Sequence, residues 1–132
     1  MDASDPNARD LAALQGVWRQ VAFEENGDSA AIDSTGAPDA LTIIDGDHFA
    51  VRTLQGALLL EGRFTLDASV TPRAITWIDA IGPDAGVPLP ASYRLEGDAF
   101  VFIAADAGAP RPTTFRTVPG LTMRAFVRHV PA

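Results

Sequence analysis

The stretch Leu14-Gln15-Gly16-Val17-Trp18 marks the point where this chain changes from a helical pattern to a β pattern. Before it, Asp5-Pro6 is typical of a helix N-cap followed by proline at the first helical position. We therefore expect a short helix from there to about Gln15, ended by Gly16. We divide the chain into a polar N-terminal segment over residues 1–10 and a β-domain over residues 11–132.

Beyond Gly16 the chain consists of short strand-like segments separated by turn-forming residues. Eight strands are expected, over residues 16–24, 40–44, 48–53, 57–66, 74–79, 91–96, 99–104 and 121–129. Loops are expected over residues 29–39, 82–86 and 107–119, where glycine and proline gather. Because the connections leave no room for crossover helices, the pattern favours an all-β antiparallel barrel or sandwich.

The composition excludes several classes of function. The 132 residues include no cysteine and no lysine, so disulfides, a thiolate nucleophile and a Schiff base are excluded. The net charge of −7 makes nucleic acid an unfavourable partner. No segment approaches the roughly 18 apolar residues of a membrane span. Residues 1–9 lack the apolar core of a secretory signal, so we expect a cytoplasmic protein.

Alternation along the strands predicts which side chains point inward. In the fourth strand Leu58, Leu60, Phe64 and Leu66 share the apolar face. The same rule selects four further inward pairs: Phe49 and Val51, Ile75 and Trp77, Tyr93 and Leu95, Phe100 and Phe102. The last strand is undecided, because Leu121, Met123, Ala125 and Val127 alternate with Thr122, Arg124, Phe126 and Arg128.

These faces define the candidate ligand-binding residues, which are Gln20, Phe49, Leu60, Phe64, Trp77, Tyr93, Phe102 and Met123. Tyr93 and Gln20 are the polar members, and Asp79 extends the inward face to the rim. A buried polar group without a partner costs roughly 1–3 kcal/mol. Each of these groups therefore needs a partner, which can be the protein itself, water or a ligand.

Metal and nucleophile chemistry have little support in this sequence. His48 follows Asp45-Gly46-Asp47, but these neighbours in one turn do not supply three or four convergent ligands, so we expect no metal and no other cofactor. Ser92 stands in a strand and not in the Gly-x-Ser-x-Gly turn of a hydrolase.

Taken in order, six motifs resemble those of an uncharacterised lipocalin-like (calycin-type) family. They are Leu14-Gln15-Gly16-Val17-Trp18, Gly46-Asp47-His48-Phe49, Pro72-Arg73-Ala74-Ile75, Gly82-Pro83-Asp84-Ala85-Gly86, Tyr93-Arg94-Leu95-Glu96-Gly97-Asp98 and Arg111-Pro112-Thr113-Thr114-Phe115. The resemblance implies a single eight-stranded up-and-down barrel. It also implies structural roles for Gly16 and Trp18, with Trp18 at the closed end beneath Arg128 or Arg124.

Three functions fit this sequence. The first is non-covalent binding of a small, largely apolar molecule inside the barrel. The second is a cofactor-independent cyclase or isomerase acting on an apolar metabolite, with Tyr93 or Asp79 as acid or base. The third is a protein-interaction module whose barrel is filled by its own side chains. The sequence leaves the oligomeric state open.

Overall fold

The computed structural model describes residues 5–25, 27–30, 40–82 and 85–129. One helix, α1 (Pro6–Leu14), precedes the strands. The strands are β1 (Gly16–Glu25), β2 (Asp28–Ala30), β3 (Leu41–Asp45), β4 (His48–Arg52), β5 (Leu58–Asp67), β6 (Arg73–Asp79), β7 (Pro88–Glu96), β8 (Ala99–Ala105) and β9 (Leu121–Arg128).

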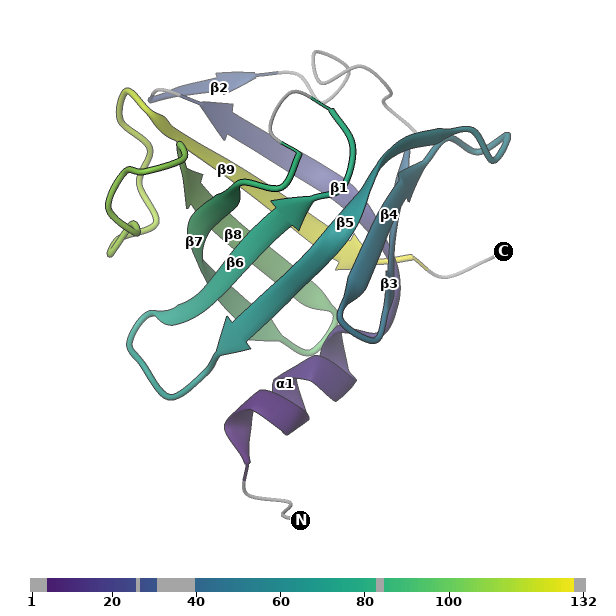
Figure 1. The fold of residues 1–132 in the computed structure, drawn as a ribbon, viewed down its shortest axis with the longest axis horizontal. Helices are drawn as coiled ribbons and strands as arrows, with labels where there is room; N and C mark the ends of the chain where they lie inside the picture. The colour runs from purple at the N-terminus through teal and green to yellow at the C-terminus, as the bar shows by residue number, and fades with distance from the viewer. Residues whose placement is uncertain (1–4, 26, 31–39, 83–84, 130–132) are drawn as a thin grey trace.

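Strand β1 and strands β3 to β9 form a closed antiparallel barrel (Figure 1). Neighbours in sequence are neighbours in the sheet, and β1 also pairs with β9, so eight strands complete the circle. The short β2 pairs with the end of β1 and lies outside this circle. The predicted all-β, up-and-down barrel is therefore confirmed. The loop expected over 29–39 begins within β2, and its residues 31–39 lie outside the described part.

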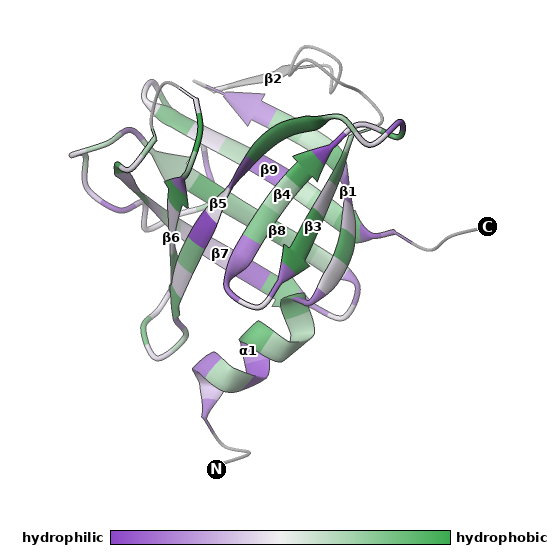
Figure 2. Ribbon diagram, turned by 45° about the vertical axis from the view of Figure 1, so that its right-hand side comes forward, coloured by the Kyte–Doolittle hydropathy of each residue, from purple (hydrophilic) through white to green (hydrophobic). Residues whose placement is uncertain are grey.

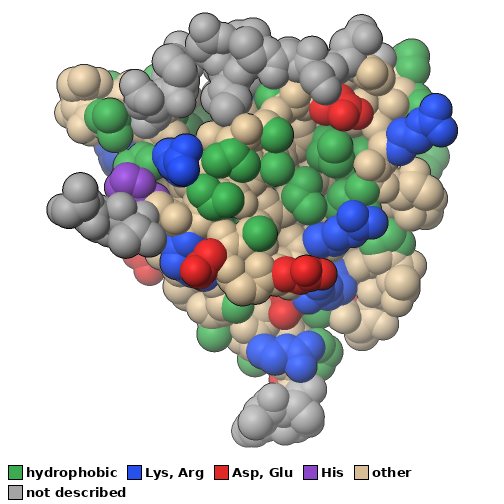
Figure 3. Space-filling view, turned by 180° about the vertical axis from the view of Figure 1, so that it is seen from behind, with side chains coloured by type: hydrophobic (Ala, Val, Ile, Leu, Met, Phe, Trp, Pro, Cys, Tyr) green, Lys and Arg blue, Asp and Glu red, His purple; other side chains and the backbone are tan. Residues whose placement is uncertain are grey.

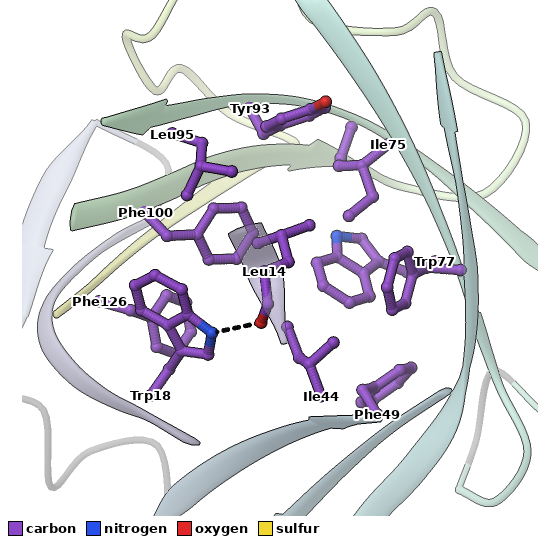
Figure 4. Packing of buried hydrophobic residues seen from close by; sticks show 12 residues of the cluster. Leu14, Trp18, Ile44, Phe49, Ile75, Trp77, Tyr93, Leu95, Phe100 and Phe126 are labelled. Atoms are coloured by element: carbon purple, nitrogen blue, oxygen red, sulfur yellow. Dashed lines mark hydrogen bonds between the residues drawn. The ribbon is translucent and has the colours of Figure 1, made fainter. Parts of the chain in front are cut away.

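Helix α1 covers one end of the barrel (Figures 1 and 2). It begins as the sequence predicts, because the Asp5 carboxylate accepts a hydrogen bond of 3.0 Å from the Asn7 amide and proline follows the cap. Leu14, at the other end of the helix, is 0% exposed and lies among the core side chains of the barrel (Figure 4). The helix therefore closes this end with an apolar side chain.

Trp18 and Arg128 hold the last turn of α1 in place. Trp18 Nε1 donates a hydrogen bond of 2.8 Å to the Leu14 carbonyl (Figure 4). The Arg128 guanidinium lies 4.4 Å from the centroid of the Trp18 ring and donates to the carbonyls of Gln15 and Ala13 at 2.9 and 2.7 Å. The contact expected for Trp18 is thus made by Arg128. Arg124 instead lies over Phe23, 4.6 Å from its ring centroid.

Gly16 joins the helix to β1 in a backbone conformation that favours glycine. Its φ is +120°, and a Cβ at this position would lie 3.2 Å from Arg128 Nη1. A side chain here would strain the turn and crowd the arginine that holds α1. The position therefore matches the structural role that the motif implies.

The predicted inward faces are confirmed for β4, β6, β7 and β8 and fail at one point in β5. The ribbon in Figure 2 shows hydrophobic and paler residues alternating along the strands. In β5 the pairing with β4 shifts, because Val51 pairs with Leu60 but Arg52 pairs with Leu58. This bulge at Leu59 turns Leu58 outward, where it is 37% exposed. The expectation that Leu58 faces the interior is therefore wrong.

The boundaries of β7 also differ from expectation. The strand begins at Pro88, three residues before the predicted start, and Pro88 and Pro90 pair with Ile78 and Thr76 of β6. Pairing with β8 begins only at Ala91. The prolines therefore lie where β7 has one neighbour, and their missing amide hydrogens break no ladder on the other side.

Strand β9 carries apolar side chains on both faces. Phe126 is buried in the core, while Met123, Ala125 and Val127 pair across the sheet with Ile103, Val101 and Ala99 on the outer face. Seen from behind, the molecule shows hydrophobic side chains gathered among charged ones (Figure 3). Alternation by itself could not choose the inward face of this strand. In the described residues, no helix has the length and apolar character to cross a membrane.

A candidate ligand cavity inside the barrel

A cavity of about 740 Å³ lies inside the barrel. Its inner end is formed by Trp18, Ile44 and Phe126, which belong to the buried core beside α1. Residues Ala40, Leu59, Asp79, Asp106 and Thr122 also line it, and they stand at or next to the strand ends on the opposite side. The cavity therefore opens at the end of the barrel away from the helix.

Aromatic rings form much of the cavity wall. Trp77 packs edge-on against Phe49, with 5.2 Å between ring centroids, and lies 4.9 Å from Phe102. Phe102 stacks on Phe126 at 6.0 Å, and Phe126 stacks on Phe100 at 5.7 Å. These five side chains make a continuous apolar surface across strands β4, β6, β8 and β9. Such a wall suits the body of an apolar ligand.

Arg124 brings a positive charge into this apolar cavity. It faces inward because it pairs with Phe102 of β8 and Phe23 of β1. Its Nη1 donates to Gln20 Oε1 at 3.3 Å, and it forms no ion pair with a carboxylate among the described residues. Burial lowers the pKa of Arg124 and the charge of Glu25 opposes this effect, but a guanidinium remains a cation near neutral pH.

Two buried nitrogen atoms have no hydrogen-bond partner in the described part of the chain. They are Gln20 Nε2 and Trp77 Nε1, both on side chains that line the cavity. Most buried polar atoms in folded proteins are hydrogen-bonded. Gln20 accepts a hydrogen bond from Arg124 through its oxygen, but its amide nitrogen donates to no acceptor among the described residues.

The structure brings five of the eight candidate ligand-binding residues to the cavity: Gln20, Phe49, Leu60, Trp77 and Phe102. Asp79 also lines it, as its place at the rim predicts. Phe64 is buried in the core against Trp77, with 5.5 Å between ring centroids, and is not part of the wall. Met123 is not part of the wall either, because its neighbours Thr122 and Arg124 take the inward positions.

Tyr93 lies at the closed end of the barrel, and it is not among the residues that line the cavity. Its side chain is 1% exposed, and its hydroxyl donates a hydrogen bond of 2.6 Å to Asp10 Oδ2 of α1. Arg73 Nη1 donates to the same oxygen at 3.0 Å. Burial raises the pKa of Tyr93 well above its ordinary value, and the hydrogen bond to Asp10 and its charge add to this. The polar partner that Tyr93 needs is thus part of the protein.

Sequence reasoning missed several residues of these two sites. The motifs assign Arg124 only a structural place beside Trp18, yet it lines the cavity. Leu59 reaches the cavity through the bulge in β5. Thr42, Asp106 and Thr122 also line the cavity. For Asp10 a signal was present, since it lies one helical turn before the buried Leu14 and so shares its face.

No protein-family model matches this chain, and no curated protein matches it either. Among the described residues, no group of three or more His, Asp or Glu side chains is placed to hold a metal ion. The closed antiparallel barrel is consistent with a lipocalin-like fold.

Proposed function

We propose that this protein binds a small, largely apolar molecule non-covalently inside its barrel. The observation that carries the proposal is the cavity of about 740 Å³, with its continuous aromatic wall and a few polar side chains. This volume and lining fall in the range of ligand pockets, which span about 300–1,000 Å³. The order of the six motifs supports a relationship to the lipocalin-like family.

The cavity favours this function over a barrel filled by its own side chains. Helix α1 closes one end with Leu14, and the other end opens to the surface. A ligand could therefore enter without unfolding the barrel. The enzymatic alternative keeps Asp79 at the cavity but has Tyr93 engaged with Asp10 at the closed end. Of these two acid–base candidates only Asp79 lies at the cavity, so binding is the better supported function.

The test uses an uncharged fluorescent probe, N-phenyl-1-naphthylamine. The chain has two tryptophans, Trp18 and Trp77, and both line the cavity. A probe bound inside the barrel should therefore quench tryptophan emission by energy transfer as its own emission rises. We expect saturable binding with this transfer. An absence of saturable binding would contradict the proposed function.

A pair of alanine substitutions on one strand locates the probe. Ala104 of β8 lines the cavity, whereas Ala99 of the same strand is exposed on the outer face. Ala104→Trp should weaken probe binding because the larger side chain takes cavity space, and Ala99→Trp should leave it unchanged. Equal effects of the two substitutions would place the probe outside the barrel. Native mass spectrometry of the purified protein would show any ligand carried through purification.

A further inference from the structure

Arg124 is a cation without an ion-paired carboxylate in the described part of the chain, and it lies in a cavity whose wall is mainly apolar. Its two contacts, the Gln20 oxygen and the Phe23 ring, are neutral. A charge removed from water is stabilised best by an opposite charge that is also hydrogen-bonded to it. The charge of Glu25 acts on Arg124, but Arg124 has no carboxylate within ion-pair distance in the described residues, so an anion hydrogen-bonded to it would stabilise it further.

The other arginines that contact core residues are engaged differently. Arg128 donates to two backbone carbonyls and forms an ion pair with Asp98 at 2.9 Å. Arg73 forms an ion pair with Asp10 at 3.0 Å. Both of these guanidiniums have an anionic partner that belongs to the fold, and Arg111 donates to the carbonyls of Ile75 and Ala91 and to the Thr76 hydroxyl. Arg124 differs because its single hydrogen bond within the described part of the chain is to a neutral amide, at the long distance of 3.3 Å.

Gln20 adds hydrogen-bond donors next to Arg124. Its oxygen faces the guanidinium, so its amide nitrogen is left with two hydrogens that no described group accepts. The guanidinium and the amide therefore offer hydrogen-bond donors side by side at one place on the cavity wall. Oxygen-rich anions such as carboxylates and sulfonates match such a set of donors.

We infer that the ligand of this cavity is an amphipathic anion, whose apolar body lies along the aromatic wall and whose single negative group is bound by Arg124. This inference rests on the proposed function, since it names the class of ligand for the same cavity. The net charge of −7 disfavours non-specific anion binding by the protein as a whole. A preference for an anion must therefore come from a local positive group.

Two probes with the same apolar body test the inference. 1-Anilinonaphthalene-8-sulfonate carries a negative sulfonate, and N-phenyl-1-naphthylamine is its uncharged counterpart. We expect the wild-type protein to bind the sulfonate probe about tenfold or more tightly than the uncharged one, because a hydrogen-bonded charge pair in a cavity contributes this much. Arg124→Gln should weaken binding of the sulfonate probe far more than binding of the uncharged probe, so that the preference is lost.

Arg94→Gln is the matched control. Arg94 also lies over an aromatic ring, 4.1 Å from the centroid of Phe115, but it is exposed and does not line the cavity. Arg94→Gln removes the same charge as Arg124→Gln but outside the cavity, so the affinities for the sulfonate probe and for the uncharged probe should both stay as in the wild type. Arg124→Lys keeps the charge and should keep most of the preference, which provides a second test if Arg124→Gln does not fold.

A second experiment repeats the comparison with aliphatic ligands that carry a carboxylate or a hydroxyl. Decanoate and decanol share their chain length, and each is used to displace the uncharged probe. Stronger displacement by decanoate in the wild type, lost in Arg124→Gln, supports the inference. Equal affinities for charged and uncharged ligands in the wild type would overturn it while leaving the cavity function intact. Failure of all probes to bind would instead overturn the proposed function.

Discussion

The hydrogen bond between Tyr93 and Asp10 leads to a specific prediction for alkaline pH. Tyr93 is the single tyrosine of a chain that has no lysine and no cysteine. The arginines stay charged far above neutral pH. Between about pH 9 and pH 12, Tyr93 is therefore the only side chain expected to lose a proton in the unfolded chain. The alkaline stability of the whole protein should report on one buried hydroxyl.

The sign follows from the direction of the pKa shift. Burial and the neighbouring Asp10 raise the pKa of Tyr93 in the folded protein, so the folded state keeps a proton that the unfolded chain releases. Stability from this source is fully present below about pH 10, the ordinary tyrosine pKa, and is lost as the pH rises towards the folded-state pKa. The free energy of unfolding should fall by about 1.4 kcal/mol per pH unit, or up to about 2.7 kcal/mol between pH 10 and pH 12.

Tyr93→Phe removes the titrating group and keeps the ring. At pH 8 the variant should be less stable by about 1–3 kcal/mol, because Asp10 loses a buried hydrogen bond. Its stability should then stay flat to pH 12, so that the two proteins converge as the pH rises. Urea unfolding followed by the fluorescence of Trp18 and Trp77 measures both curves. Phenolate absorbance should appear in the wild type only together with unfolding.

Two outcomes would refute this reasoning. An unchanged free energy of unfolding of the wild type up to pH 12 would show that Tyr93 titrates alike in both states. The same loss of stability in Tyr93→Phe would show that another group causes it. Either result would mean that the contact with Asp10 does not control the ionisation of Tyr93.

Two further substitutions test the closed end and the strand pairing. Arg128→Gln should lower the free energy of unfolding by about 2–4 kcal/mol, since it removes the hydrogen bonds to the carbonyls of Ala13 and Gln15 and the contact with Trp18. Arg19→Gln, at an exposed position of β1, should have little effect. Equal melting temperatures for the two variants would contradict the role of Arg128. Gly62→Ala should cost about 3 kcal/mol or more, because the added Cβ would clash with the Ile78 carbonyl oxygen of the neighbouring strand. Native-like thermal unfolding of Gly62→Ala would show that β5 and β6 can separate there at little cost.

Local patterns in the sequence determined most of the fold. Asp5-Pro6 specifies the start of α1, and the alternation of apolar residues specifies the inward faces of β4, β6, β7 and β8. Turn residues such as Gly46 and Gly97, both with positive φ, specify the hairpins. These features could be predicted because each depends on side chains only a few residues apart.

The candidate site was predicted only in part, because its missing residues depend on contacts between distant segments. Alternation found Trp77 and Phe102, which lie on strands with one clearly apolar face. It could not decide between Met123 and Arg124, since both faces of β9 carry apolar side chains and the pairing with β1 and β8 selects the inward one. The bulge that moves Leu59 to the cavity likewise exists only in the pairing of β4 with β5.

The sequence by itself therefore determined an all-β chain with a capped helix and turns in defined places. Closure of the barrel by β1 and β9 decided the rest. It placed Arg124 inside the cavity, and packing of α1 against the closed end gave Tyr93 a partner 83 residues away in the chain. The physical reason is that strand register and helix docking are fixed by many weak contacts across the whole barrel, which no short stretch of sequence contains.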